Sequence, residues 1–126
     1  MRTKFFLLML LASVLISFKP EEKTTEALFG IWINPSKDVK IKIEEIRGQT
    51  RAVLYWTSKP EAKEHVGKVV IKEINPDGSN FKAFVIAPEK RKFVHAVIEF
   101  KSTDTIVITG FDQGKSVSKV YRKVKV

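Results

Sequence analysis

The stretch LFGIWINPSKDVKIKI, from Leu28 to Ile43, contains a short apolar segment, a turn and an alternating run in immediate succession. Asn34-Pro35-Ser36-Lys37-Asp38 has the residues of a turn, because proline fixes φ and both Asn and Asp bond the local backbone. After it, valine and isoleucine alternate with charged residues from Val39 to Glu44, which predicts a half-buried strand. The stretch therefore predicts two successive strands, with Gly30 and Trp32 in the first.

The rest of the chain repeats this pattern of short alternating runs separated by turn residues. Further strands are predicted over 50–57, 66–74, 81–85, 93–100, 105–111 and 115–126. The one helix-start signal is Ser58-Lys59-Pro60-Glu61, with Ser58 as N-cap, and it predicts one or two turns ending near Gly67. About seven or eight strands without a long helix predict an all-β, antiparallel up-and-down barrel, because closure removes exposed sheet edges. A two-sheet sandwich is the alternative.

The N-terminal residues 1–19 have the layout of a cleavable signal peptide. Arg2 and Lys4 precede an uncharged, mostly apolar run from Phe5 to Phe18. This run is shorter than the roughly 20 residues that a membrane-spanning helix needs, and an uncleaved interfacial anchor or a core helix is the alternative. Residues 20–27 are polar and predict a flexible leader, which leaves 28–126 as the barrel domain. We expect an exported protein, periplasmic or secreted, without a transmembrane segment in the mature chain.

The composition restricts chemistry and partners. The chain has no cysteine, which excludes disulfides, a thiolate nucleophile and cysteine-based metal sites. Of its 23 Lys and Arg residues three precede Pro20, so the mature chain holds 20 basic against 14 acidic residues, a net charge of +6. That charge favours anionic surfaces such as phospholipid, lipopolysaccharide or acidic glycan. The basic residues stand mostly at alternate strand positions, however, which favours a solvated outer face.

The two ends of the chain supply a predicted structural plug. Arg122 lies on the same face of the last predicted strand as three valines, where a guanidinium needs a partner. In a closed barrel the first and last strands are neighbours, so we expect Arg122 over the indole of Trp32, with Gly30 giving the room. A Trp32 that stacks on a ligand is the functional alternative.

Several short motifs resemble known families. Gly30-x-Trp32 with an Arg in the last strand resembles the calycin pattern of lipocalins and fatty-acid-binding proteins. The chain also resembles the bacterial domain-of-unknown-function family 2147, which consists of small exported proteins. The shared features are Gly30-x-Trp32, Leu54-Tyr55-Trp56, Val66-Gly67-Lys68, Pro76-Asp77-Gly78, Pro88, Ile108-Thr109-Gly110-Phe111 and Tyr121-Arg122. The resemblance implies an exported calycin-like barrel without an assigned activity. It departs at Ala87-Pro88-Glu89-Lys90, which replaces the family's Asp-Pro-x-x-Gly-x-x-Tyr segment, and Phe93 stands near the expected Tyr.

No residue cluster identifies a catalytic group. The only imidazoles are His65 and His95, and Glu61 with His65 supplies two metal ligands where zinc requires three or four. No serine stands in a nucleophile-elbow context, and no Gly-rich phosphate loop is present. We therefore expect a non-enzymatic protein without metal or cofactor.

Two binding functions remain for a small basic barrel. The first is binding of a small apolar or amphipathic ligand, which would be lined by inward-facing residues. These residues are Ile41, Ile43, Phe81, Val85, Ile98, Phe100 and Ile108. A dry core requires the same residues, and the small size of the chain favours it.

The second function is an envelope protein-binding or inhibitor module that acts through a basic rim. The rim would consist of the Ser58–His65 insert, the Lys90–Phe93 corner and exposed aromatic residues. The candidate ligand-binding residues are Tyr55, Trp56, Phe93 and His95. Because Tyr55 and Trp56 are consecutive and point to opposite faces of a regular strand, at least one of them is expected in the core. Export argues against nucleic acid as a partner.

Overall fold

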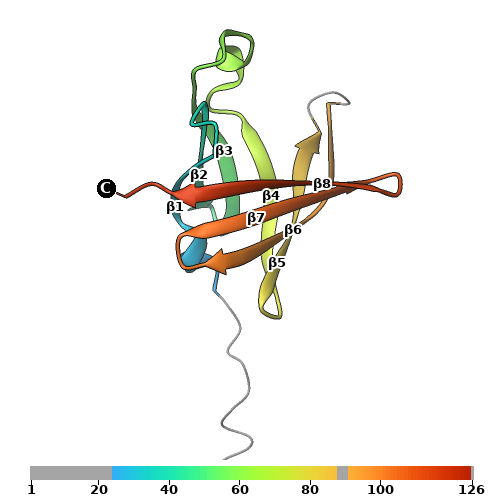
Figure 1. Ribbon diagram of the computed structural model, residues 1–126. Helices are drawn as coiled ribbons and strands as arrows, with labels where there is room; N and C mark the ends of the chain where they lie inside the picture. The colour runs from blue at the N-terminus through green and yellow to red at the C-terminus, as the bar shows by residue number, and fades with distance from the viewer. Residues whose placement is uncertain (1–23, 88–90, 126) are drawn as a thin grey trace, which may run out of the picture.

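The computed structural model describes residues 24–87 and 91–125 of the chain. Eight antiparallel strands form a closed up-and-down barrel in which each strand pairs with the next and β1 pairs with β8 (Figure 1). The predicted barrel is thus confirmed, and the sandwich alternative is wrong. The signal peptide predicted over 1–19, the leader residues 20–23 and the turn residues 88–90 lie outside the described residues.

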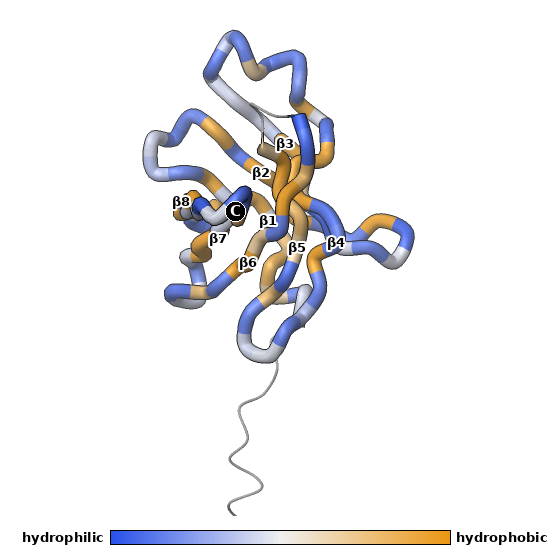
Figure 2. The backbone as a smooth tube through the Cα atoms, turned by 90° about the vertical axis from the view of Figure 1, so that its right-hand side faces the viewer, coloured by the Kyte–Doolittle hydropathy of each residue, from blue (hydrophilic) through white to orange (hydrophobic). Residues whose placement is uncertain are grey.

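The eight strands and two short 3-10 helices follow one another along the chain. Their bounds are η1 (Thr25–Leu28), β1 (Gly30–Ile33), β2 (Val39–Ile46), β3 (Gln49–Thr57), η2 (Pro60–His65), β4 (Val69–Asp77), β5 (Asn80–Ala87), β6 (Lys92–Ser102), β7 (Thr105–Asp112) and β8 (Lys115–Lys123). Figure 2 shows hydrophobic and hydrophilic residues alternating along the strands, with hydrophilic residues in the connecting loops. This alternation turns one face of each strand toward the core.

Three local predictions need correction. Ser58 does not cap η2, because Lys59 stands at the N-cap position and no side chain bonds the helix start. The strand predicted over 66–74 starts and ends later, since β4 begins at Val69 and continues through Pro76 to Asp77, where it pairs with β5. Of the leader expected over residues 20–27, residues 25–27 form η1 together with Leu28, whose side chain is buried.

The core fills the barrel with apolar side chains. It consists of Leu28, Trp32, Ile41, Ile43, Ala52, Ile71, Ile74, Phe81, Ala83, Ala96, Ile98, Ile106 and Ile108. Phe100 and Tyr121 pack against this cluster from β6 and β8. Burial of such side chains is the main stabilising term in a chain that has no disulfide.

Trp32 is fully buried, at 0% exposed, where the first and last strands meet. Its indole Nε1 donates a hydrogen bond of 2.8 Å to the carbonyl oxygen of Leu28, so the indole holds η1 against the barrel end. Its ring also lies edge-on to Phe100 of β6, with 6.3 Å between ring centroids. Trp32 therefore connects η1, β1 and the opposite wall of the barrel.

The cation over this indole is Lys123, whose Nζ lies 5.6 Å from the ring centroid. The prediction that Arg122 occupies this place is wrong, because β8 turns Tyr121 and Lys123 inward and leaves Arg122 exposed. The aliphatic stem of a lysine packs on apolar surface while its ammonium group stays near water, so Lys123 suits the position. Gly30 has φ +134°, and a Cβ there would lie 3.0 Å from Cε of Lys123. The room predicted at Gly30 thus serves Lys123.

Replacing Lys123 by Ala should lower the free energy of unfolding by about 1–2 kcal/mol, because the substitution removes the cation–π contact and uncovers the indole face. The matched Arg122→Ala change removes an exposed side chain and should cost less than about 0.5 kcal/mol. Urea denaturation of both variants measures the difference. A larger loss in Arg122→Ala than in Lys123→Ala would contradict this assignment.

Candidate functional site

Tyr55 and Trp56 are both exposed on the outer surface of β3, at 46% and 41%. A β-bulge causes this arrangement. Lys40 pairs with Trp56 while the next residue of β2, Ile41, pairs with Leu54, so Tyr55 is an extra residue in β3. A bulge resets the alternation of side chains, and Thr57 is consequently buried. The expectation that at least one of the two aromatic residues is in the core is therefore wrong.

A lysine side chain of β2 lies over each of these exposed rings. Nζ of Lys40 lies 5.1 Å from the centroid of Trp56, and Nζ of Lys42 lies 5.8 Å from that of Tyr55. We call these four residues the aromatic–lysine patch. Exposed rings with adjacent cations suit a partner that offers both apolar and anionic groups.

A cleft lies on the outer surface where β3 and β4 separate. The two strands pair at Ala52 with Ile71 and at Val53 with Val69, with a register shift between these pairs. The start of β3, from Gln49 to Arg51, has no partner on β4 among the described pairs. The opening has a volume of about 370 Å³ and is lined by Gln49, Arg51, Val69, Lys72, Glu73 and Phe93. We call it the β3–β4 cleft.

Glu73 stands in this cleft on a bulge of β4. Lys72 pairs with Phe84 and Asn75 pairs with Lys82, so Glu73 and Ile74 together face a single residue of β5. Glu73 has φ +53°, whereas the other described non-glycine residues with positive φ all lie in turns between strands. A strained conformation inside a strand is a feature that points to function.

Two cations and an aromatic ring line the cleft beside Glu73. Nζ of Lys72 lies 4.5 Å from the ring centroid of Phe93. Nε of Arg51 is buried and has no hydrogen-bond partner among the described residues. A buried donor without a partner costs free energy, and the rest of this half-buried guanidinium places a positive charge in the wall of the cleft.

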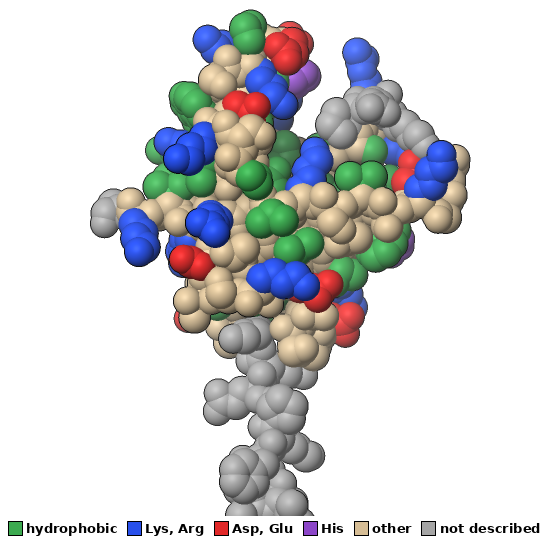
Figure 3. All heavy atoms as spheres, in the orientation of Figure 1, with side chains coloured by type: hydrophobic (Ala, Val, Ile, Leu, Met, Phe, Trp, Pro, Cys, Tyr) green, Lys and Arg blue, Asp and Glu red, His purple; other side chains and the backbone are tan. Residues whose placement is uncertain are grey.

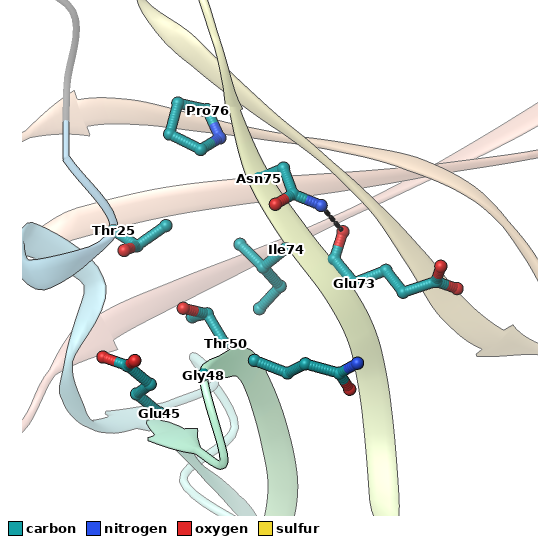
Figure 4. Close-up of a pocket in the computed structure, with 9 residues that line it drawn as sticks. Thr25, Glu45, Gly48, Thr50, Glu73, Ile74, Asn75 and Pro76 are labelled. Carbon is teal, nitrogen blue, oxygen red and sulfur yellow. Dashed lines mark hydrogen bonds between the residues drawn. The ribbon is translucent and has the colours of Figure 1, made fainter.

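A second cavity of about 350 Å³ opens at the end of the barrel and shares Gln49 and Glu73 with the β3–β4 cleft. In Figure 4, Thr25 of η1, Thr50 of β3 and Ile74 of β4 lie around this cavity, while the Glu73 carboxylate points away from them. The side-chain amide of Asn75 donates a hydrogen bond of 3.2 Å to the backbone oxygen of Glu73, which supports the bulge. Most of the other lining side chains are polar.

The four candidate binding residues fall into two separate pairs. Tyr55 and Trp56 lie on β3, whereas Phe93 and His95 lie on the outer face of β6, with β4 and β5 between the two pairs. Phe93 joins the β3–β4 cleft. His95 is exposed, and its ring centroid lies 4.7 Å from that of Phe84.

The residues expected to line an interior ligand cavity pack against one another instead. Ile41, Ile43, Phe81, Ile98 and Ile108 belong to the buried core, and Val85 and Phe100 pack against it. Both cavities described above open to the surface. The interior of the barrel therefore favours the dry core over the ligand cavity.

Sequence reasoning missed Gln49, Arg51, Lys72 and Glu73. The sequence signal for them is the spacing of two isoleucines, Ile71 and Ile74, which stand three residues apart. The structure buries both. In a regular strand, residues three apart point to opposite faces, so this spacing indicates a bulge.

Two titrating groups elsewhere are shifted by their surroundings. Hydrogen bonds from the hydroxyls of Ser102 and Thr105 lower the pKa of Asp104, and the charge of Arg122 adds to this effect. Burial raises the pKa of Tyr121, and the nearby carboxylate of Asp38 raises it further. Neither group lines the β3–β4 cleft.

No protein family, curated protein or solved structure was found to match this chain. The resemblance to family 2147 therefore stays a prediction. Within residues 24–87 and 91–125, no group of three or more His, Asp or Glu side chains is placed to hold a metal ion. No helix in these ranges is both long and apolar enough to cross a membrane.

Replacing Glu73 by Gly should raise the free energy of unfolding by about 0.5–1 kcal/mol, because glycine adopts positive φ without the steric cost that glutamate bears. Glu73→Ala removes the carboxylate but keeps the strain, so it serves as the control. Thermal and urea unfolding of the two variants compare them directly. A Glu73→Gly protein less stable than Glu73→Ala would show that the bulge does not hold this backbone conformation.

Proposed function

We propose that the protein is an exported, non-enzymatic binding protein that holds a small amphipathic anion in the β3–β4 cleft. The observation that carries the proposal is the half-buried guanidinium of Arg51 in the wall of the cleft, whose buried Nε has no hydrogen-bond partner among the described residues. Together with Lys72 it gives the cleft two cations against the one carboxylate of Glu73, so an anionic head group would be attracted. The export part of the proposal rests on the signal-peptide layout of residues 1–19.

The other walls of the cleft support an amphipathic ligand over a simple anion. Val69 and the ring of Phe93 supply apolar surface, and Lys72 adds a second positive charge above that ring. The volume of about 370 Å³ falls in the range of small-ligand sites. Gln49 adds an amide that both donates and accepts hydrogen bonds.

Octanoate is a suitable probe because it combines a carboxylate with a short apolar chain. Arg51→Gln and Lys72→Gln should each weaken octanoate binding about tenfold or more, since a hydrogen bond to a charged group contributes about 1.5–3 kcal/mol. Lys82→Gln, at an exposed lysine of β5 outside the cleft, should leave binding unchanged. Titration calorimetry measures all three, with octanol as the uncharged control ligand.

Equal octanoate affinity in Arg51→Gln and Lys82→Gln would argue against the cleft as the site. If octanol binds as tightly as octanoate, Arg51 and Lys72 do not contribute to binding through their charge. Native mass spectrometry of protein purified from its host then identifies the natural ligand.

The aromatic–lysine patch supports a second candidate function, a module that binds an envelope protein or another anionic envelope component. The specific observation is the bulge that turns both Tyr55 and Trp56 outward. Large aromatic side chains are enriched at the centres of protein interfaces and contribute much of their binding energy.

Trp56→Ser should reduce saturable retention of envelope components on the immobilised protein by at least about fivefold, because Trp residues dominate interface energies. Phe111→Ser, which removes an exposed ring on β7 far from the patch in strand order, is the matched control and should retain them. Quantitative pull-down across a range of extract concentrations measures the effect. Equal retention by both variants would exclude the patch.

A further inference from the structure

We propose that β8 binds an extended acidic segment of a partner protein as an additional antiparallel or parallel strand along its free edge. β1 pairs with β8 at Trp32 with Lys123 and at Ile33 with Arg122, and one further hydrogen bond joins Val124, just after β8, to Ile31. On its other side, β8 pairs with β7 along its whole length, from Lys115 to Arg122. Within the described chain, the β1-side edge of residues 115–121 therefore has no strand beside it (Figure 1).

The sequence of the first turn explains why this edge stays free. The Asn34 side-chain oxygen accepts hydrogen bonds from the backbone N–H groups of Asp38 and Val39, at 3.1 and 3.0 Å. These bonds form a tight turn that ends β1 after Ile33. β1 is thus too short to cover β8, and the barrel closes at one end of that strand only.

Backbone directions show which groups face the free edge. The N–H of Lys123 donates to the Asp104 oxygen on the β7 side, and the N–H of Val124 donates to the Ile31 oxygen on the β1 side. Because backbone groups alternate along a strand, those of Ser116, Ser118 and Val120 point to the β1 side as well. They lie beyond the last residue of β1 that pairs with β8, so a new strand would find a row of donors and acceptors there.

The charge of β8 selects the chemistry of the partner. The strand carries Lys115, Lys119, Arg122 and Lys123 and no acidic residue. Acidic side chains on an added strand would stand opposite or diagonal to these cations, where opposite charges attract. The same charges disfavour pairing between two copies of β8, because that pairing would bring two basic strands together.

The side chains of β8 leave room for a partner and offer it apolar contacts on both faces. Val117 is 63% exposed and Val120 is 39% exposed, and they lie on opposite faces of the strand. Ser116 and Ser118 are small and exposed. In the same orientation as Figure 1, Figure 3 shows a hollow in the surface above β8. Strand addition uses backbone pairing for affinity and such alternate side-chain contacts for selection.

A short, end-capped peptide of alternating Glu and Val serves as the probe, and fluorescence anisotropy measures its binding. Ser118→Pro should weaken binding at least about tenfold, because proline removes a donor from the free edge and leaves the β7 ladder intact. Ser118→Ala keeps the donor and should bind like the unmodified protein. Lys119→Glu should also weaken binding, whereas Lys82→Glu, with the same change in net charge, should not.

A second probe keeps the test decisive even if Ser118→Pro does not fold. The same peptide, N-methylated at two neighbouring central residues, cannot pair through either of its edges, so the unmodified protein should bind it at least about tenfold more weakly. Equal binding of both peptides would overturn the proposal, because it would show that charge attraction alone holds the peptide. Sedimentation that reveals a dimer which the unmethylated peptide dissociates would instead identify the occupant of the edge as a second copy and would also overturn the proposal.

Discussion

The packing of one indole, that of Trp32, joins the parts of this barrel that are farthest apart in the chain. The indole is buried, donates a hydrogen bond to Leu28 in η1, and lies edge-on to Phe100 in β6. On its other side it is covered by Lys123 of β8. Because β1 is only four residues long, backbone pairing alone gives this closure little support. Side-chain contacts therefore contribute a large share of the stability of the contact between β1 and β8.

Two bulges determine what the outer surface presents. The bulge between β2 and β3 turns Tyr55 and Trp56 outward together, and the bulge in β4 places Glu73 beside the opening between β3 and β4. In a regular strand every second residue faces outward, so neither the aromatic–lysine patch nor the β3–β4 cleft would form. The barrel core is compatible with both bulges because the next inward residues, Thr57 and Ile74, remain buried. The candidate sites are thus irregularities on a regular scaffold.

The short β1 determines which strand edge of the barrel stays uncovered. It closes the sheet around Trp32 and leaves most of one edge of β8 uncovered. Apart from Tyr121, every ionisable side chain of this exposed strand is basic. The positive charge protects the strand against pairing with its own copies and suits an acidic partner. A single local feature, the Asn34 turn, therefore shapes both the closure and the free edge.

The sequence by itself determined the all-β class, the antiparallel order and the closure of the first strand on the last, and it indicated about seven or eight strands. These follow from alternation and turn residues, which are local properties, and from the cost of open sheet edges. It also placed Trp32 at this closure, with Gly30 giving the room for a cation over the indole. What only the tertiary structure decided is which residue lies beside which across neighbouring strands. A one-residue bulge reverses every side chain beyond it, and the register of a strand depends on its partners. For this reason Lys123 rather than Arg122 covers the indole, Tyr55 and Trp56 share one surface, and Arg51 meets Lys72 and Glu73 in a cleft.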